Sequence, residues 1–315
     1  MGKEHIPKNK PVLFLPNHQS ALLDVLLIAT DCKRKPFFLT RSDVFSNSFL
    51  NRIFTYFRML PIYRIRDGRN TLAKNNAIFD ACAAILGRNK AIVMFPEANH
   101  NLRRRVRPLS KGFTRVIERS LKKYPDLDIQ IVPVGLNYQH PKRFPDEVAV
   151  YYGKAISVKE IYNEIDDDKV IVEVLKEKVA EQLERLTTHI EDIENYDQIA
   201  NRLEALRVDF LKPEEVNRII AETSIDDIQK NPKHKVFNNS NLWHRFFRMI
   251  NMPVFFFWRN LVLPKIREAE FIGTFRFAFG LICFPVYWLL LFILVSVFIN
   301  PSIVVFIILG FITFN

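Results

Sequence analysis

His18 and Asp24 are the residues of this chain whose types and spacing first suggest chemistry. They follow the apolar run Val12–Leu15, which predicts a short buried strand. A histidine can take a proton from an alcohol, and a neighbouring carboxylate can fix its tautomer and stabilise the imidazolium that forms. The pair therefore predicts a general base, His18, oriented by Asp24. The alternative is a purely structural pair, which is the commoner role for these two residue types taken alone.

The spacing between His18 and Asp24 limits how the two side chains can meet. Residues six positions apart on a continuous helix point about 240° apart, so they cannot face each other there. We therefore expect His18 in a loop and Asp24 one turn inside the helix that follows. Ser20 then takes the N-cap position, which serine favours. The alternative is that Ser20 is a nucleophile that forms a covalent intermediate. Such an intermediate is not needed if the alcohol attacks its target directly.

Three later blocks also join apolar runs to polar or charged residues: Leu60–Gly68, Val93–His100 and Ile131–Tyr138. Together with the His18 block, in order and rough spacing, they resemble the four motifs of the glycerolipid and lysophospholipid acyltransferases. That family includes the glycerol-3-phosphate and 1-acylglycerol-3-phosphate O-acyltransferases. The resemblance covers roughly residues 1–155, and a weaker likeness to bacterial members with a helical insert and C-terminal membrane segments covers the rest.

Two positions depart from the family pattern. Five residues separate His18 from Asp24 instead of the commoner four, which resembles a branch that includes fungal glycerol-3-phosphate acyltransferases. We expect a bacterial member with this longer spacing. Ala98 stands where the Phe-Pro-Glu block usually has glycine, which would permit a closer backbone approach. Neither departure removes a group that the chemistry needs.

The resemblance also implies residues that bind the substrate. Arg64 has the position of the second-motif arginine and is expected to bind the acceptor phosphate, with Arg66 as the second choice. Glu97 matches the third-motif glutamate, which shapes the acceptor site in relatives; its alternative is a structural ion pair. Lys111 precedes Gly112 where relatives have Lys-Gly before a helix, so Lys111 and that helix N-terminus are expected to hold phosphate.

Other polar residues admit simpler interpretations. His100 is a second candidate base, but a hydrogen-bonded loop histidine fits the motif order better. The arginines at 103–105 and 107 are interpreted as a surface patch that attracts anionic lipid. Nucleic acid is not expected as a partner, because the chain lacks the aromatic and basic interleaving of a known reader. Asp166–Asp168 predicts a solvated helix start, since nothing supplies the remaining ligands of a metal site.

Apolar runs and helical segments alternate along the front of the chain, which favours an α/β fold with a mostly parallel sheet flanked by helices. The motifs should lie at strand ends, where such sheets place their sites. The expected strands are Val12–Leu15, Pro36–Leu39, Ala91–Phe95, Ile129–Val134 and Val148–Tyr152. The expected helices are Ala21–Thr30, Ser48–Phe57, Asn70–Leu86 and Lys111–Lys123.

Charge divides the chain into regions. The net charge of +11 comes from +15 in residues 1–155, −10 in residues 156–230 and +6 in the remainder. We predict an acyltransferase domain at 1–157, an acidic helical region and linker at 158–250, and an interfacial segment with a membrane region at 251–315. The basic first region and tail suit an anionic membrane surface.

No charged residue follows position 276, and Phe277–Ile299 is 23 residues long. As a helix it would extend about 34 Å, enough to cross a hydrocarbon layer of about 30 Å. Basic residues precede this segment, which places the catalytic domain on the cytoplasmic side of the cytoplasmic membrane. They are Arg259, Lys265, Arg267 and Arg276.

These observations lead to one functional prediction. The chain should be a membrane-bound O-acyltransferase of phospholipid biosynthesis that uses acyl-CoA or acyl carrier protein as donor. The acceptor would be lysophosphatidate or glycerol 3-phosphate, with other lysophospholipids as alternatives, and no metal or organic cofactor is expected. The rival prediction from another class is a non-catalytic lipid-binding membrane protein of the same fold.

Overall fold

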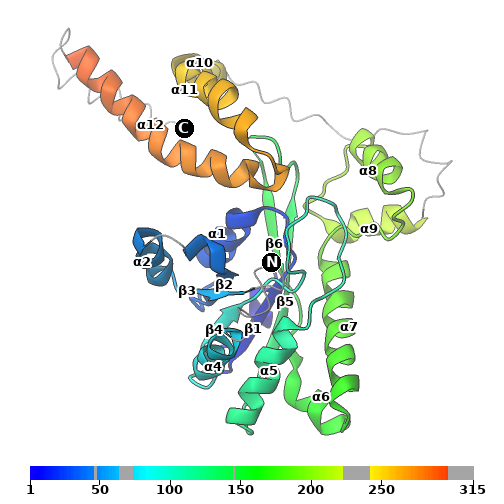
Figure 1. Ribbon diagram of the computed structural model, residues 1–315. Helices are drawn as coiled ribbons and strands as arrows, with labels where there is room; N and C mark the ends of the chain where they lie inside the picture. Colours follow the sequence, from blue (N-terminus) through cyan, green and yellow to red (C-terminus); the bar gives the residue numbers. More distant parts are fainter. Residues whose placement is uncertain (46–47, 64–73, 145, 223–241, 297–315) are drawn as a thin grey trace. The chain divides into compact units, whose positions relative to one another are not determined.

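The structure is a computed structural model that describes residues 1–45, 48–63, 74–144, 146–222 and 242–296. The chain forms two compact units, Met1–Lys235 and Val236–Asn315. The described part of the first unit contains a seven-stranded sheet with helices on both faces (Figure 1). The described part of the second unit is helical.

The sheet has the order β3-β2-β4-β1-β5-β6, and β7 also pairs with β5. Strands β1 to β5 run parallel, whereas β6 and β7 run antiparallel to β5. The predicted mostly parallel α/β sheet is therefore confirmed. The strands are β1 (Val12–Pro16), β2 (Phe37–Arg41), β3 (Met59–Ile62), β4 (Ala91–Val93), β5 (Gln130–Tyr138), β6 (Val148–Tyr152) and β7 (Ile156–Ser157).

The sequence analysis did not predict β3. This strand has four residues and contains Pro61, so its pattern is too short and too interrupted to stand out. It lies at the edge of the sheet, where the missing N–H of a proline is tolerated.

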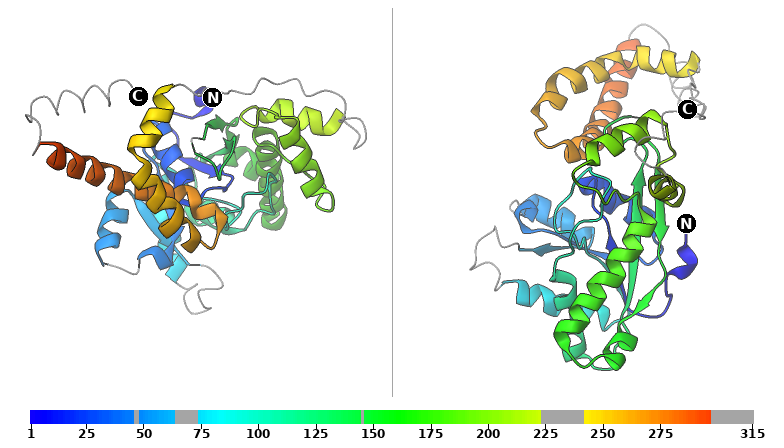
Figure 2. Two further views of the ribbon diagram at one scale, coloured as in Figure 1. Left: turned by 90° about the horizontal axis from the view of Figure 1, so that it is seen from above. Right: turned by 90° about the vertical axis from the view of Figure 1, so that its right-hand side faces the viewer.

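Helices cover both faces of this sheet. Helices α4, α5 and α7 pack on one face, and α1 and α2 pack on the other (Figures 1 and 2). The helices of the first unit are α1 (Ala21–Asp31), α2 (Ser48–Tyr56), α4 (Lys74–Leu86), α5 (Gly112–Lys123), α6 (Val158–Glu164), α7 (Asp168–Leu186), α8 (Tyr196–Ala205) and α9 (Pro213–Glu222).

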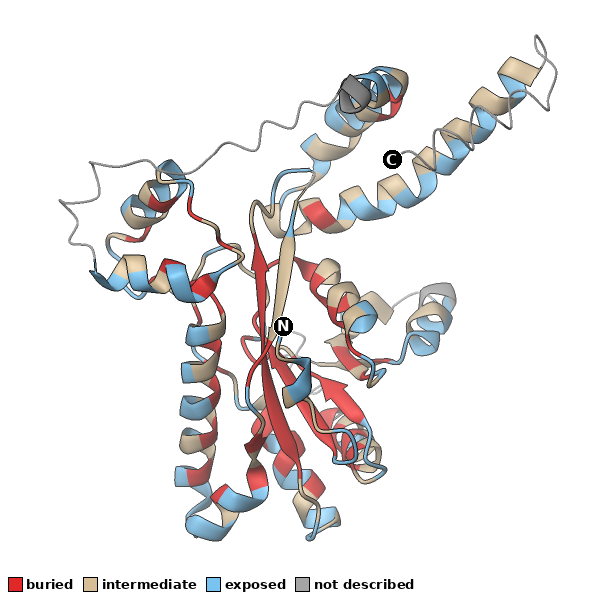
Figure 3. Ribbon diagram, turned by 180° about the vertical axis from the view of Figure 1, so that it is seen from behind, coloured by how far each residue is buried: buried red, intermediate tan, exposed pale blue. Residues whose placement is uncertain are grey.

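Strand β1 lies at the centre of the hydrophobic core. Leu13 and Leu15 face the cluster that contains α4, α5 and α7, whereas Val12 and Phe14 face the cluster that contains α1. All four side chains are fully buried, as the red strands in Figure 3 show. Burial on both faces explains why the sequence of this strand is continuously apolar rather than alternating.

Helix α7 belongs to the same core as the sheet. Leu175 and Val179, in the middle of its apolar stripe, are fully buried in the cluster that contains Leu13 and Leu15. The compact unit therefore extends past residue 157, where the sequence analysis placed a domain boundary. Asp167 caps α7 by accepting a hydrogen bond from Lys169 N at 2.7 Å, which agrees with the helix start predicted from the acidic run.

The second unit consists of three helices and short connecting turns within residues 242–296. Helices α10 (Leu242–Ile250) and α11 (Met252–Phe257) are followed by a π-helical turn, Trp258–Val262, and by α12 (Ile272–Ser296). The hydroxyl of Tyr287 on α12 donates to Ile250 O at 2.6 Å. Ala269–Ser296 is 28 residues long and contains an 18-residue stretch with a mean hydropathy of 2.5, so it is long and apolar enough to cross a membrane.

Candidate active site

The order of the strands brings three of the four motif blocks together. Strand β1 lies between β4 and β5, and the three strands are parallel. Their carboxyl ends therefore meet at one edge of the sheet, where His18 follows β1, Glu97 follows β4 and Tyr138 ends β5. The block with Arg64 and Arg66 follows β3, three strands away from β1, and these two arginines lie outside the described residues.

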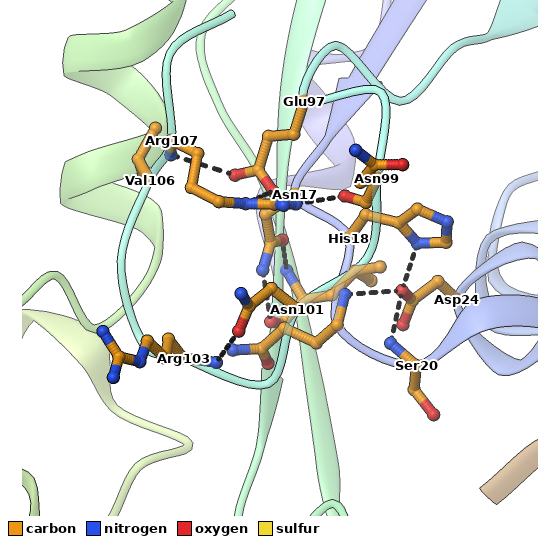
Figure 4. A network of polar contacts seen from close by, with 12 residues as sticks. Asn17, His18, Ser20, Asp24, Glu97, Asn99, Asn101, Arg103, Val106 and Arg107 are labelled. Carbon is orange, nitrogen blue, oxygen red and sulfur yellow. Dashed lines mark hydrogen bonds and ion pairs between the residues drawn. The ribbon is translucent and has the colours of Figure 1, made fainter. Parts of the chain in front are cut away.

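His18 and Asp24 are in direct contact. The distance from His18 Nδ1 to Asp24 Oδ2 is 2.7 Å (Figure 4). His18 lies in the loop before α1, and Asp24 lies in the first turn of that helix, as the spacing predicted. The carboxylate engages Nδ1, so Nε2 is the ring nitrogen that can receive a proton from a substrate.

The Asp24 carboxylate is held by three further donors. Oδ2 accepts hydrogen bonds from the backbone N–H groups of Gln19 and Ser20, each at 2.8 Å, and Oδ1 accepts one from the Tyr138 hydroxyl at 2.6 Å. Asp24 is completely buried. Burial, followed by the charge of Asp24, raises the pKa of Tyr138 well above its usual range, so the phenol remains a donor. The orientation of the carboxylate is thus fixed.

Ser20 occupies the predicted N-cap position of α1, but its side chain makes no capping hydrogen bond. Its side chain is buried and points away from the His18 ring (Figure 4). This geometry favours the structural role of Ser20 over the alternative of a nucleophile.

The His18 ring is also fixed by packing. It stacks on Phe95, with ring centroids 3.9 Å apart and an interplanar angle of 24°. His100 lies edge-on to it at 5.5 Å. The backbone N–H of Asn101 donates to His18 O at 3.0 Å. Both Phe95 and His100 come from the third motif block, so that block positions the candidate base.

Glu97 forms an ion pair with Arg107. Two bonds from the Arg107 guanidinium reach Glu97 Oε2, at 3.1 Å from Nε and 2.5 Å from the terminal nitrogen. The same guanidinium donates to Asn99 O. Burial raises the pKa of Glu97, and the charge of Arg107 opposes this. The ion pair that the sequence analysis gave as an alternative is therefore present, and Glu97 also lines the pocket beside His18.

Ala98 has a φ of +62°, in the left-handed region. Glycine adopts this region without steric cost, whereas an L-residue with a Cβ does not. This explains why a glycine at this position would suit the turn between Glu97 and Asn99. The chain keeps the turn with an alanine, at the cost of backbone strain.

The arginine run between 103 and 107 is not a uniform surface patch. Arg104 donates to Tyr138 O at 3.0 Å and to Gln139 O at 3.1 Å, and its guanidinium lies 3.5 Å from the Phe210 ring centroid. Burial lowers the pKa of Arg104 to about 10. Together with the ion pair of Arg107, this makes the membrane-surface interpretation wrong for Arg104 and Arg107.

A small pocket opens beside His18, with a volume of about 230 Å³ that includes its solvent-open part. Its walls are mostly polar and include Gln19, Glu97, Asn101, Arg103, Arg105 and Thr188. The sequence analysis did not assign Gln19, Asn101 or Thr188 to the site. Lys111 is not among the described residues that line this pocket. It lies at the start of α5, with its Nζ 3.8 Å from Glu173 Oε1.

Within the described ranges, no group of three or more His, Cys, Asp or Glu side chains is placed to hold a metal ion. The polar side chains that line the pocket are an imidazole, amides, hydroxyls, guanidinium groups and the carboxylate of Glu97. Such groups can move a proton and bind an anion.

Comparisons with known proteins give matches to two fungal proteins and to one solved structure. Glycerol-3-phosphate O-acyltransferase 1 from Saccharomyces cerevisiae is 30% identical over 113 residues, which are 35% of this chain and 15% of the yeast protein. An uncharacterised acyltransferase from Schizosaccharomyces pombe is 31% identical over 80 residues, 25% of this chain and 12% of that protein. A 1-acyl-sn-glycerophosphate acyltransferase structure from Thermotoga maritima covers 57% of this chain and 70% of its own, with 16% identity and a TM-score of 0.39.

The matched segments are a small part of both fungal relatives, 15% and 12% of their lengths. The family model for acyltransferases matches residues 1–137. This range contains His18, Asp24 and Glu97 and nearly all of the fourth motif block, so the family resemblance of the sequence is confirmed. Residues 1–137 are therefore a domain of the acyltransferase family.

Proposed function

We propose that the chain is a membrane-attached O-acyltransferase of phospholipid biosynthesis. It transfers a fatty acyl group from the thioester of acyl-CoA or acyl carrier protein to a hydroxyl of glycerol 3-phosphate or 1-acyl-sn-glycerol 3-phosphate. The observation that carries the proposal is the 2.7 Å contact between His18 Nδ1 and Asp24 Oδ2 beside a polar pocket, within an acyltransferase-family domain.

In this proposal His18 acts as the general base. Its Nε2 takes the proton of the acceptor hydroxyl while the oxygen attacks the thioester carbonyl carbon. The carbon–sulfur bond then breaks, and the departing thiolate takes the proton from the imidazolium. Asp24 stabilises the imidazolium between these steps. The thioester itself supplies the activated acyl group, so the reaction balances with donor and acceptor alone.

The acceptor phosphate needs fixed cations. Arg103 and Arg105 line the pocket with His18 and are the described arginines best placed for this role. Arg64, Arg66 and Lys111 remain proposed phosphate ligands on the basis of the family resemblance. Membrane attachment is proposed through Ala269–Ser296, with the catalytic domain on the cytoplasmic side because basic residues precede this segment.

The first test is His18→Ala in the purified full chain, with labelled acyl donor and a panel of acceptors. We expect the turnover number to fall by about 10³-fold or more, because the proton acceptor is lost. His5→Gln is the matched control, since the Nδ1 of His5 bonds to the backbone oxygen of Tyr152 and no role is proposed for it. A fully active His18→Ala enzyme would refute the base assignment. Binding of lysolipid by the wild type with no turnover of any acceptor would support the non-catalytic alternative.

A further inference from the structure

Thr187 and Thr188 line the pocket that contains His18, and they begin the segment Thr187–Ile190, which follows α7. The chain at Arg104 and Val106 holds this segment in place through two hydrogen bonds. Ile190 N donates to Arg104 O at 2.9 Å, and Val106 N donates to His189 Nδ1 at 3.1 Å. Burial lowers the pKa of His189, against the opposing charge of Glu184, so its ring stays neutral and can accept this bond. The pocket wall is therefore preorganised.

Asn217 on α9 fixes the same segment from the other side. Its amide nitrogen donates to Glu184 O and to Thr187 O, each at 2.9 Å, and its oxygen accepts from His189 N at 2.9 Å. The helical region between α6 and α9 thus supplies a rigid part of the site, although the family model ends before it, at residue 137.

Two side-chain atoms of residues that line this pocket are buried and have no hydrogen-bond partner among the described residues. They are Thr188 Oγ1 and Gln19 Oε1. Thr188 is 2% exposed and Gln19 is 7% exposed, and both residues line the pocket. A buried polar atom without a partner is costly, so its presence in a rigid wall points to a ligand that supplies the missing bond.

The chemistry of the two atoms defines the ligand. The amide oxygen of Gln19 can only accept, so its partner must carry a hydroxyl or another donor. The hydroxyl of Thr188 can donate to an anion, and the guanidinium groups of Arg103 and Arg105 add positive charge to the same pocket. A polyol phosphate monoester offers both an anion and hydroxyl donors.

We propose that Thr188 and Gln19 bind the glycerol-phosphate headgroup of the acceptor opposite His18, so that the helical region takes part in selecting the acceptor. This inference rests on the proposed acyltransferase function. Thr188 donates to a phosphate oxygen of either acceptor, and Gln19 accepts from the second free hydroxyl of glycerol 3-phosphate, which lysophosphatidate does not have. Both residues act in positioning and specificity, and neither takes part in the proton transfer.

A binding experiment tests the proposal independently of turnover. The Tm of the full chain in detergent is measured with glycerol 3-phosphate, with lysophosphatidate and with glycerol. We expect either phosphate ester to raise the Tm of the wild type and glycerol not to do so. Thr188→Val should reduce this shift, whereas Thr188→Ser should keep it. Thr114→Val is the control, because Thr114 is as buried but its hydroxyl already donates to Lys111 O.

Kinetics then separate this proposal from the function on which it rests. With glycerol 3-phosphate as acceptor, we expect Thr188→Val to raise the acceptor KM about tenfold or more, the effect of one hydrogen bond to a charged group. Gln19→Leu, which removes a bond to a neutral hydroxyl, should raise it about fivefold, and the donor KM should not change in either variant. The Tm of unliganded Thr188→Val should not fall, since no protein bond is lost. Normal turnover with an unchanged acceptor KM in both variants overturns the inference and leaves the proposed function standing. Binding of the phosphate esters that depends on Thr188, without any turnover, would support the inference and contradict the proposed function.

Discussion

At the scale of single residues, Asp24 combines two tasks. Its carboxylate contacts the candidate base. It also accepts hydrogen bonds from the backbone N–H groups of Gln19 and Ser20, just before α1. An anion at a helix N-terminus is favoured by the helix dipole and satisfies N–H groups that have no partner within the helix. The same side chain therefore stabilises the loop and prepares it for chemistry.

The Tyr138 hydroxyl should stabilise this arrangement. We expect Tyr138→Phe to lower the free energy of unfolding by about 2 kcal/mol, because a buried carboxylate loses a hydrogen bond. The turnover number should fall less than in His18→Ala, since the His18 contact remains. Denaturant unfolding and acyl-transfer assays measure the two effects.

The control for Tyr138→Phe is Tyr151→Phe. The hydroxyl of Tyr151 donates to the neutral Leu211 O at 2.7 Å, so a smaller loss of about 1 kcal/mol is expected. Equal losses in the two variants would show that the charge of Asp24 adds nothing to the bond.

Ala98 gives a second prediction for a single residue. Its φ of +62° strains an alanine and not a glycine, so Ala98→Gly should raise the free energy of unfolding by up to about 1 kcal/mol. Ala77→Gly, at an exposed position inside α4, should instead lower it by about 1 kcal/mol. Thermal unfolding of both variants compares them, and a loss in Ala98→Gly would exclude strain at this turn.

At the scale of elements, the close approach of β5 to the end of α7 holds the pocket wall. A Cβ on Gly135 would lie 2.2 Å from the backbone oxygen of Leu186, just before Thr187 and Thr188. The side-chain amide of Asn137 donates to the same oxygen at 2.8 Å. The absence of a side chain at Gly135 thus lets the helical region reach the active site.

Gly135→Ala should therefore be strongly destabilising. We expect a loss of about 3 kcal/mol in the free energy of unfolding and a lower acyl-transfer rate, because the backbone after α7 must move. Gly112→Ala is the matched control: its Cβ would lie 2.5 Å from Met94 Cε, the end of a flexible side chain, and at ordinary contact distance, 3.7 Å, from Ser110 Oγ. That variant should change stability by less than about 1 kcal/mol. A tolerated Gly135→Ala would contradict the close packing.

Elements and residues differ in how far the sequence predicts them. The contact between His18 and Asp24 and the helix that carries Asp24 follow from local spacing and apolar periodicity, and the structure agrees. The bond from Tyr138 to Asp24 joins residues 114 positions apart, and no local pattern encodes it. The same holds for Thr188, which reaches the pocket only because α7 packs on the sheet.

At the scale of the whole molecule, the two compact units have different surfaces. Leu281, Leu290 and Leu294 on α12 are more than half exposed, as are Met252 and Phe256 before it. Exposed apolar side chains in such number are typical of contact with lipid or with another apolar surface. The first unit forms three buried apolar clusters of its own, although single apolar side chains such as Tyr56, Phe144 and Ile193 are exposed on it.

Detergent phase separation tests this difference between the units. We expect the full chain to enter the detergent-rich phase because the 28-residue apolar helix binds detergent. Residues 1–235 alone should stay in the aqueous phase and keep a cooperative thermal transition, since their cores are formed within that unit. Recovery of the full chain from the aqueous phase would contradict membrane attachment through Ala269–Ser296.

The central place of β1 has a consequence for how the protein matures. Val12 pairs with Ala91 on one side and with Gln130 on the other, so both neighbours of this strand are made much later than the strand itself. Pairings between distant parts of a chain form slowly, because a long loop must close first. During synthesis His18 and Asp24 emerge early, but their surroundings are complete only after most of the first unit has left the ribosome. A nascent chain should therefore gain catalytic competence late and abruptly, and activity can report that the sheet has closed.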